Sequence, residues 1–199
     1  MYLVDVKIKG VKPFLFHKFN IECLQDTQKP KSGSIGNDPY EWMNTFFHDQ
    51  NKLYMPGTYM MSTLNNGSVH TKVGRGTLKK TWMSAIQIDN EKIYFNRSIP
   101  EGWEEWKVED FILDSSKDVY IDVRMVQNPN TKGRNVRYRL AMSPGWECEF
   151  SLICDPSLLS KENIEKVIRD TGKMQGIADG RTLGYGRYQV EDIKFSNMD

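Results

Sequence analysis

The sequence predicts an α+β fold, in which an antiparallel sheet packs against helices. Several runs alternate apolar and polar residues with a period of two, which is typical of half-buried β-strands. Two other stretches, residues 58–66 and 160–172, carry the apolar spacing and the end signals of helices. A chain of 199 residues is long enough for one domain with insertions. These observations favour a single domain over residues 1–199.

The long strands are predicted at both ends and in the second half of the chain. Residues 2–8 alternate strictly, so they predict a strand with one buried face. Residues 119–141 have the pattern of a long hairpin, whose polar turn spans residues 127–135. We expect further alternating strands at 146–154 and 187–195.

Shorter elements are expected between these strands. The apolar residues within 39–48 favour a short helix. Short strands are predicted at 52–55, 82–88 and 92–95. The segment 25–39 is polar and contains Gly, Pro, Ser and Asn, which predicts a long loop.

The ends of the two helices have recognisable signals. Thr58 is expected to cap the first helix, and residues 65–67 (Asn-Asn-Gly) to end it. Ser160 is expected to cap the second helix, and Gly172 to close it. The order of elements then suggests a ferredoxin-like (RRM-like) βαββαβ core with an antiparallel sheet. The hairpin and the early loop would be insertions, at about 20–50 and 100–145.

Charge and cysteine content restrict the function classes. Lys and Arg number 27, and Asp and Glu number 26, so the formal net charge is +1. This near balance excludes a protein that binds nucleic acid through overall charge alone, so binding requires local clusters of cations. Cys23, Cys148 and Cys154 are too widely spaced for a disulfide framework or a zinc site. We therefore expect neither a metal nor another cofactor.

The cysteines and the N-terminus also indicate a compartment. Cys148 and Cys154 lie on one face of an alternating strand, which favours two small core residues. Such cysteine usage suits a reducing compartment. The first residues alternate instead of forming the apolar block of a signal peptide, and no apolar run has the length of a membrane span. These features predict a cytoplasmic protein without a membrane partner.

The glycine-rich segment before the last strand carries the strongest functional signal. Five glycines fall within residues 172–186, and glycine permits positive φ and close backbone approach. Successive exposed amides can then form a concave site for a phosphate group. The alternative is that these glycines serve only a helix end and tight turns. A Walker or Rossmann loop is excluded because such a loop follows a strand and opens a helix, whereas here the helix comes first.

Side chains around this segment fit the same chemistry. Lys173, Arg181 and Arg187 supply positive charge beside the glycines. Tyr185 and Tyr188 are expected either to stack on bases or to pack inward.

Two basic clusters add to the signal. One lies in a glycine-containing loop and the other on the predicted hairpin, where alternate residues share one face. Each phosphate contact adds salt-dependent affinity, with a slope of about 0.7 per contact for single strands. The alternative is that both clusters are ordinary solvated surface. The members are His70, Lys72, Arg75, Lys79 and Lys80 in the loop, and Lys132, Arg134, Arg137 and Arg139 in the hairpin.

The C-terminal loop resembles the glycine-rich loop of the RAMP superfamily, the repeat-associated RNA-binding proteins of CRISPR systems. The matching pattern is Gly176-x-x-x-Gly180-Arg181-x-x-Gly184-Tyr185-Gly186-Arg187-Tyr188. A second segment, 53–64, is similar to the strand, Pro-Gly-Ser and helix segment of the backbone subunits that coat guide RNA. Residues 10–15, after the first strand, also fit that group. The resemblance covers about a quarter of the chain. It departs where the family helix often ends in Gly-x-x-Arg, because Ser62, Asn65 and Asn66 stand there.

The resemblance implies an RNA-binding subunit that assembles side by side along guide or single-stranded RNA. Its genetic context would be a CRISPR locus or, for a solitary relative, a phage or prophage. Loop amides and arginines would hold phosphates, with little readout of bases. The residues implied in RNA binding are the Lys and Arg residues named above, together with His17, Lys18, Gly180, Gly184, Tyr185 and Gly186.

Two alternatives remain open. RNA-processing enzymes of the same superfamily often use a histidine, so the chain would be a metal-independent endoribonuclease with His17 as general acid/base. Target-cleaving backbone subunits instead use a loop aspartate with a metal, and Asp26, Asp38 and Asp49 are equal candidates for that role. From a different class, the chain would be a structural phage protein whose glycine loop is only a turn.

Overall fold

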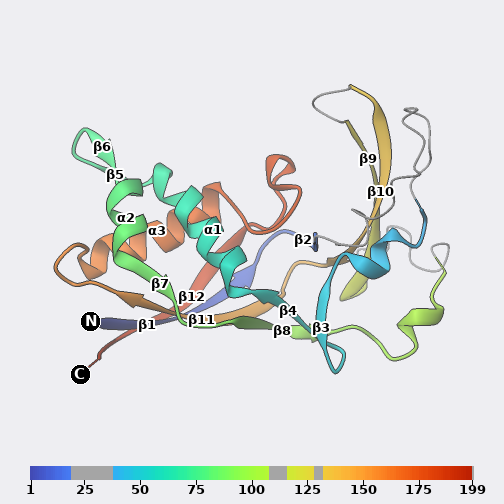
Figure 1. The fold of residues 1–199 in the computed structure, drawn as a ribbon, viewed down its shortest axis with the longest axis horizontal. Helices are drawn as coiled ribbons and strands as arrows, with labels where there is room; N and C mark the ends of the chain where they lie inside the picture. The colour runs from blue at the N-terminus through green and yellow to red at the C-terminus, as the bar shows by residue number, and fades with distance from the viewer. Residues whose placement is uncertain (19–37, 108–115, 128–131, 199) are drawn as a thin grey trace, which may run out of the picture.

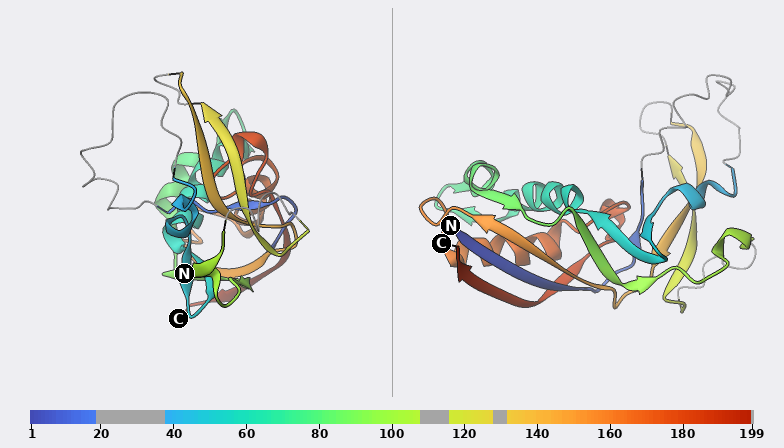
Figure 2. Two further views of the ribbon diagram at one scale, coloured as in Figure 1. Left: turned by 90° about the vertical axis from the view of Figure 1, so that its right-hand side faces the viewer. Right: turned by 60° about the horizontal axis from the view of Figure 1, so that its bottom comes forward.

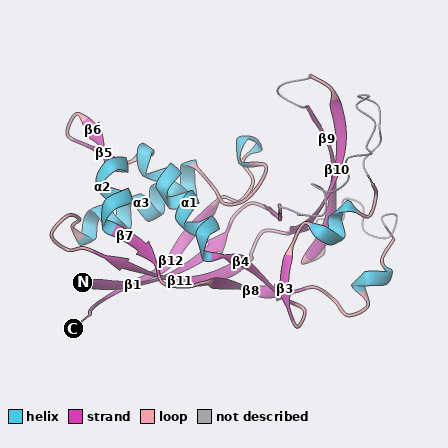
Figure 3. Ribbon diagram, viewed as in Figure 1, coloured by secondary structure: helices cyan, strands magenta, loops and turns pink. Residues whose placement is uncertain are grey.

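The computed structural model describes residues 1–18, 38–107, 116–127 and 132–198. Within them the chain has the α+β architecture that the sequence predicts, with antiparallel strands and with helices on one face of the larger sheet (Figures 1 and 3). The helices are α1 (Gly57–Gly67), α2 (Lys79–Ala85) and α3 (Lys161–Met174). The strands are β1 (Tyr2–Gly10), β2 (Phe14–Leu15), β3 (Phe47–Asp49), β4 (Lys52–Pro56), β5 (Lys72–Val73), β6 (Gly76–Thr77), β7 (Ile86–Ile88), β8 (Lys92–Ser98), β9 (Val119–Gln127), β10 (Arg134–Met142), β11 (Glu147–Cys154) and β12 (Tyr188–Asn197).

The larger sheet has the strand order β12-β1-β11-β8-β4-β3, and β7 pairs separately with β11. The alternation in β1 buries Val4, Val6 and Ile8, which confirms the predicted strand with one buried face. Val6 lies opposite Phe150 of β11 and Ile193 of β12. Burying such aligned apolar rows supplies the main driving force for folding.

Two glycines in the helices let neighbouring elements approach closely. Gly67 at the end of α1 has a helical φ of −70°, and a Cβ there would collide with the side chain of Thr171 in α3. A Cβ on Gly172 would collide with Tyr188 of β12. The expectation that Gly172 closes the second helix is wrong, because α3 continues past it and the left-handed Gly176 (φ 74°) follows. Gly172 is needed for packing instead.

A second sheet, with the order β2-β10-β9, forms the other end of the molecule. Its strands β9 and β10 pair from Val119 opposite Met142 to Gln127 opposite Arg134, which confirms the predicted hairpin. This hairpin projects at one end, whereas the two chain termini and the small β5–β6 hairpin lie at the other (Figures 1 and 2).

Two secondary-structure predictions are corrected. Residues 39–48 form no α-helix, because only a 3-10 turn at Glu41–Asn44 precedes the edge strand β3. The strand predicted at 82–88 is wrong in its first part, where α2 runs to Ala85. Trp82 and Ala85 are both buried and lie three positions apart, a helical spacing that the apparent alternation concealed.

The predicted helix caps have different outcomes. The hydroxyl of Ser160 accepts a hydrogen bond from the Asn163 amide at 3.2 Å, which confirms this cap. Thr58 lies inside α1, which begins at Gly57 and has no side-chain cap, so that prediction is wrong.

Both described cysteines are core residues, as expected. Cys148 and Cys154 are buried free thiols, and burial raises the pKa of both, that of Cys154 to about 12. Thiols with raised pKa values are poor nucleophiles, so their role here is packing. Cys23 and residues 25–37 of the predicted loop lie outside the described residues. Among the described helices, none has the length and apolar character required to cross a membrane.

Candidate nucleic-acid interface

The glycine-rich segment forms a loop whose tip is open and whose base is packed. Gly180 and Gly184 have left-handed φ values of 71° and 85° and flank a 3-10 turn. Leu183 in this turn is 65% exposed, and a Cβ on Gly184 would meet nothing within 4 Å. A Cβ on Gly186 would instead collide with the carbonyl oxygen of Ile177 across the loop. The glycines therefore serve turn geometry at the tip and close packing at the base.

The backbone amides of this loop already donate hydrogen bonds within the chain. The amide of Ile177 donates to Gly186 O at 3.0 Å, and that of Gly186 donates to Pro13 O at 2.7 Å. The amide of Asp179 donates to Leu15 O at 3.2 Å. Further amides with acceptors inside the loop belong to Gly180, Leu183, Gly184 and Tyr185. These seven amides therefore cannot form the expected cradle of bare amides, because they already bond to acceptors in the loop or on Pro13 and Leu15.

Arginine–aspartate pairs hold the loop against the β9–β10 hairpin. Arg139, only 5% exposed, forms an ion pair with Asp179 of the loop. It also lies 4.0 Å from Asp122, whose carboxylate is completely buried. Arg124 donates from Nε to both carboxylate oxygens of Asp122 at 2.8 Å. Arg139, which was expected to contact phosphate, is thus committed to internal pairs.

His17, two residues after the end of β2, lies at the same junction. Its Nδ1 is 3.9 Å from the Asp179 carboxylate, and both side chains are partly exposed. The Tyr59 hydroxyl donates to the His17 carbonyl at 2.8 Å and fixes the backbone there. Burial raises the pKa of Asp179, but Arg139, the Gly180 amide and His17 together outweigh burial and hold that pKa below its usual value. Asp179 therefore remains an anion facing the imidazole at neutral pH.

Tyr185 connects the loop to the hairpin through its ring. The Arg124 guanidinium lies 4.6 Å from the ring centroid, a cation–π contact. Tyr185 was predicted from the sequence, whereas Arg124, Asp122 and Asp179 were missed. The signal was present in the hairpin register, because Asp122 lies directly opposite Arg139 across β9 and β10.

The other hairpin cations divide into paired and exposed ones. Arg137 is bound by Glu41, with Nη2 2.7 Å from Oε1. Lys132 and Arg134, nearer the tip of the hairpin, are exposed. The hairpin therefore exposes the cations near its tip to solvent, whereas Arg137 and Arg139, farther from the tip, form ion pairs within the chain.

The loop cations and Lys18 also differ in exposure. Lys173 and Lys18 are exposed, and Arg181 is half-buried. Arg187 is half-buried, and its Nη1 is shielded from solvent without a hydrogen-bond partner among the described residues. Tyr188, the alternative base-stacking residue, is buried in the core, where its hydroxyl donates to Ile168 O at 3.0 Å.

The second basic cluster lies far from this junction. Lys72, Arg75, Lys79 and Lys80 are exposed on β5, its turn and α2. Figure 1 places β5 and α2 at the end of the molecule opposite the β9–β10 hairpin. The two predicted clusters therefore form two separate surfaces, and a polyanion that touched both would have to cross the helical face.

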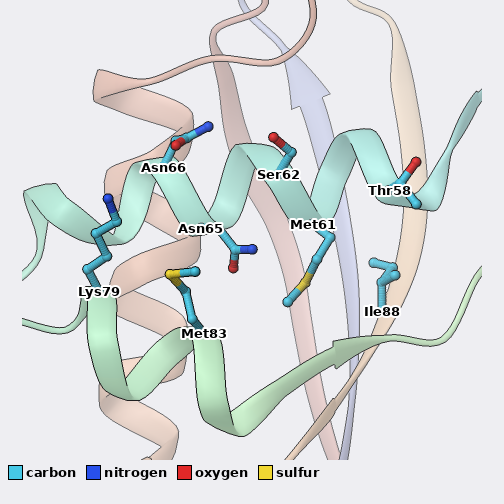
Figure 4. Close-up of a pocket in the computed structure, with 8 residues that line it drawn as sticks. All are labelled: Thr58, Met61, Ser62, Asn65, Asn66, Lys79, Met83 and Ile88. Carbon is cyan, nitrogen blue, oxygen red and sulfur yellow. The ribbon is translucent and has the colours of Figure 1, made fainter.

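A groove between α1 and α2 lies on that face (Figure 4). It has a volume of about 430 Å³. Thr58, Ser62 and Asn66 line its α1 side, and Lys79 lines its α2 side. The Oδ1 atom of Asn65 is shielded there without a hydrogen-bond partner among the described residues. The groove thus runs from Thr58, at the start of α1, to Lys79 of the second basic cluster.

Of the three aspartates considered as metal ligands, two accept hydrogen bonds from groups of the protein and one lies outside the described residues. Asp49 accepts hydrogen bonds from Lys92 Nζ and from the Tyr94 hydroxyl, each at 3.0 Å. Asp38 accepts the amide of Tyr40 at 2.9 Å, and Asp26 is not among the described residues. Within the described part of the chain, no group of three or more His, Cys, Asp or Glu side chains gathers as a metal site.

The fold has a counterpart among solved structures. The chain is similar to one in the cryo-EM structure of the Type III-B Cmr-beta complex bound to cognate target RNA, with a TM-score of 0.55 and 15% identity. The match covers 98% of this chain and 60% of that chain, so this chain spans about three-fifths of its counterpart's length. No protein-family model and no curated protein sequence matches the chain. The comparisons therefore establish a likeness of fold.

Proposed function

We propose that this chain binds single-stranded RNA as a subunit of the kind that lines guide RNA in CRISPR effector complexes. The observation that carries the proposal is the junction of three distant segments, where His17 faces Asp179 and Arg124 lies over the Tyr185 ring. Arg139 links the two contacts, because it lies near both Asp179 and Asp122, the partner of Arg124. Basic side chains beside an aromatic ring are the groups that hold phosphates and stack on bases. The likeness in fold to a chain of an RNA-bound complex adds support.

We also infer a ferredoxin-like unit in the helix-covered part of a single domain over residues 1–199. The neighbouring strands β12-β1-β11-β7, with α1 before β7 and α3 between β11 and β12, match the order expected for a βαββαβ unit. The β9–β10 hairpin and β2–β4 would then be insertions into this unit.

The proposal assigns phosphate binding to side chains instead of amides. The residues assigned to this role are Lys132 and Arg134, which are exposed near the end of the hairpin, and Arg181, which is partly exposed on the loop. The internal Arg139 pairs keep the hairpin and the loop in a fixed relation. Such preorganisation lowers the entropy cost of binding an extended polymer.

The test is the salt dependence of binding to a fluorescent single-stranded RNA. Replacing Lys132, Arg134 and Arg181 by Gln is expected to weaken binding and to reduce the log–log salt slope by about 0.7 for each phosphate that is no longer neutralised. Arg169→Gln is the control, because Arg169 is an exposed arginine of α3 paired with Glu165. Unchanged affinity and slope in the triple variant would contradict the proposed phosphate-binding residues.

A second candidate function is a metal-independent endoribonuclease. It is favoured by the half-exposed His17 imidazole, which an anionic Asp179 faces at 3.9 Å. Such a histidine can accept the proton of an RNA 2′-hydroxyl that attacks the adjacent phosphate. Cleavage in the presence of EDTA that disappears in His17→Ala would support this candidate. Cleavage that persists in His17→Ala, or no cleavage by the wild type, would contradict it.

The assembly and its genetic context belong to the same proposal. Side-by-side copies along one RNA would give a number of bound copies per RNA molecule that rises in steps with RNA length. Purified protein that carries no nucleic acid and forms no such steps would contradict the assembly. It would favour the remaining alternative of a structural protein without a nucleic-acid role.

A further inference from the structure

A row of aromatic rings crosses the three outer strands of the larger sheet. Phe47 of β3 lies directly opposite Tyr54 of β4, which lies directly opposite Tyr94 of β8. The ring centroids are 5.6 Å apart for the first pair and 5.7 Å apart for the second. Tyr59 of α1 continues the row, 5.7 Å from Phe47. Cross-strand register therefore aligns three of these rings, and Tyr59 extends them into one continuous strip of four.

The strip faces outward. On β4 and β8 the alternate residues Leu53, Met55 and Ile93 are buried, so Tyr54 and Tyr94 lie on the opposite face. Tyr94 is exposed and Tyr54 is half-buried. The residues next to these tyrosines in the sequence are thus buried in the core, whereas the two tyrosine rings lie at the surface.

Each of the three strand rings is accompanied by a lysine. Lys18 Nζ lies 5.4 Å from the Phe47 centroid, and Lys92 Nζ lies 5.0 Å from that of Tyr54. Lys52 Nζ lies 5.4 Å from the Tyr94 centroid. The only acidic group bonded within this strip among the described residues is Asp49, which holds Lys92 and the Tyr94 hydroxyl. The strip is therefore aromatic and net positive, which complements a polymer of bases and phosphates.

The strip is continuous with the candidate interface. Tyr59, its inner ring, donates its hydroxyl to the carbonyl of His17, and Lys18 is the next residue. A strand of RNA that leaves the loop–hairpin junction at His17 would thus meet the rings in succession. This continuity distinguishes the strip from an isolated surface patch.

We propose that Phe47, Tyr54 and Tyr94 form a platform on which unpaired RNA bases stack, with Lys18, Lys52 and Lys92 contacting the phosphates between them. The proposal deepens the proposed function and rests on it. A lysine is held over an exposed ring more weakly than a stacked base, and its stem is flexible, so a base displaces the ammonium toward the adjoining phosphate.

The experiment measures binding of labelled oligoadenylate to the full chain by fluorescence anisotropy. Tyr54→Ala with Tyr94→Ala is expected to weaken binding by about tenfold for each ring removed, while the salt slope stays unchanged. Tyr54→Phe with Tyr94→Phe keeps both rings and is expected to bind like the wild type. Tyr40→Ala is the control, because Tyr40 is 50% exposed and lies outside the strip. Duplex RNA, whose bases are covered, should not distinguish the variants.

Each outcome is decisive. If the wild type binds RNA and the double alanine variant binds equally well, the platform is wrong and the proposed function stands. If the wild type does not bind RNA, the proposed function fails as well. A changed oligomeric state with unchanged RNA affinity would assign the face to a second copy of the chain and overturn the platform. Circular dichroism checks folding, and Tyr94→Ala alone serves if the double variant misfolds.

Discussion

The helix-covered end and the hairpin end of the molecule make their close contacts by different means. In the former, Gly67 lets α1 touch α3, and apolar side chains fill the remaining space. In the latter, Arg139 joins two aspartates from separate segments, one of them completely buried. An apolar side chain can be exchanged for another of similar volume at modest cost, whereas a buried charge must keep its partner. The hairpin end should therefore be the more sensitive to single polar substitutions.

The largest expected effect is that of Arg139→Ala. This change leaves the buried Asp122 with Arg124 alone and removes the cation from Asp179, so the free energy of unfolding should fall by about 3 kcal/mol. Urea denaturation checks this value. Arg169→Ala, which breaks an exposed helical pair, should cost less than about 0.5 kcal/mol. Equal losses of unfolding free energy in the two variants would contradict the claim that the buried ion pair contributes more to stability than the surface pair.

Gly67→Ala tests the helix-covered end. The added Cβ collides with Thr171, so we expect a loss of about 2 kcal/mol in the free energy of unfolding, relieved in part by Thr171→Ala. Gly76→Ala is the matched control, because its nearest atom is 3.9 Å away. Equal stability of the Gly67 and Gly76 variants would show that α1 and α3 do not approach as closely as described.

Gly184→Ala, at the loop tip, measures the cost in stability of placing a side chain on a left-handed backbone without any steric collision. Its φ of 85° disfavours any side chain, but the space around it is empty, so the expected cost is about 1 kcal/mol. Gly186→Ala adds a collision with Ile177 to a similar φ and should cost distinctly more by the same denaturation assay. The reverse order would contradict the division of the loop into an open tip and a packed base.

The smallest expected effect is on the way the free energy of unfolding depends on pH. The pKa of Asp179 is lower in the folded chain than its unfolded value of about 3.9, so its contribution to stability is complete above about pH 4. That contribution is lost as the pH falls through the lower folded value. Wild type should therefore lose unfolding free energy more steeply than Asp179→Asn below about pH 4. Parallel pH profiles would mean that Asp179 gains nothing from Arg139.

The sequence predicted the parts of the fold that local pattern determines. Period-two alternation located β1, the hairpin and β11, and the Ser160 cap marked the start of α3. The boundary between α2 and β7 was missed because Trp82, Ala85 and Ile86 suit a strand or a helix equally in a short window.

The candidate site depends on contacts between distant segments, which a single sequence does not reveal. The loop amides find acceptors on Pro13 and Leu15, far away in the chain. Likewise, the pairing of Asp179 with Arg139 requires the loop to return to the hairpin. Local composition therefore drew attention to the loop but could not show that several of its amides already have acceptors within the chain.

Titration of the wild-type chain with single-stranded RNA over a range of salt concentrations tests the central claim most directly. We expect saturable binding that is tighter than to duplex RNA, with log affinity falling linearly with log salt concentration by about 0.7 per phosphate contact. Absence of binding at low salt would contradict an RNA-binding role for this chain.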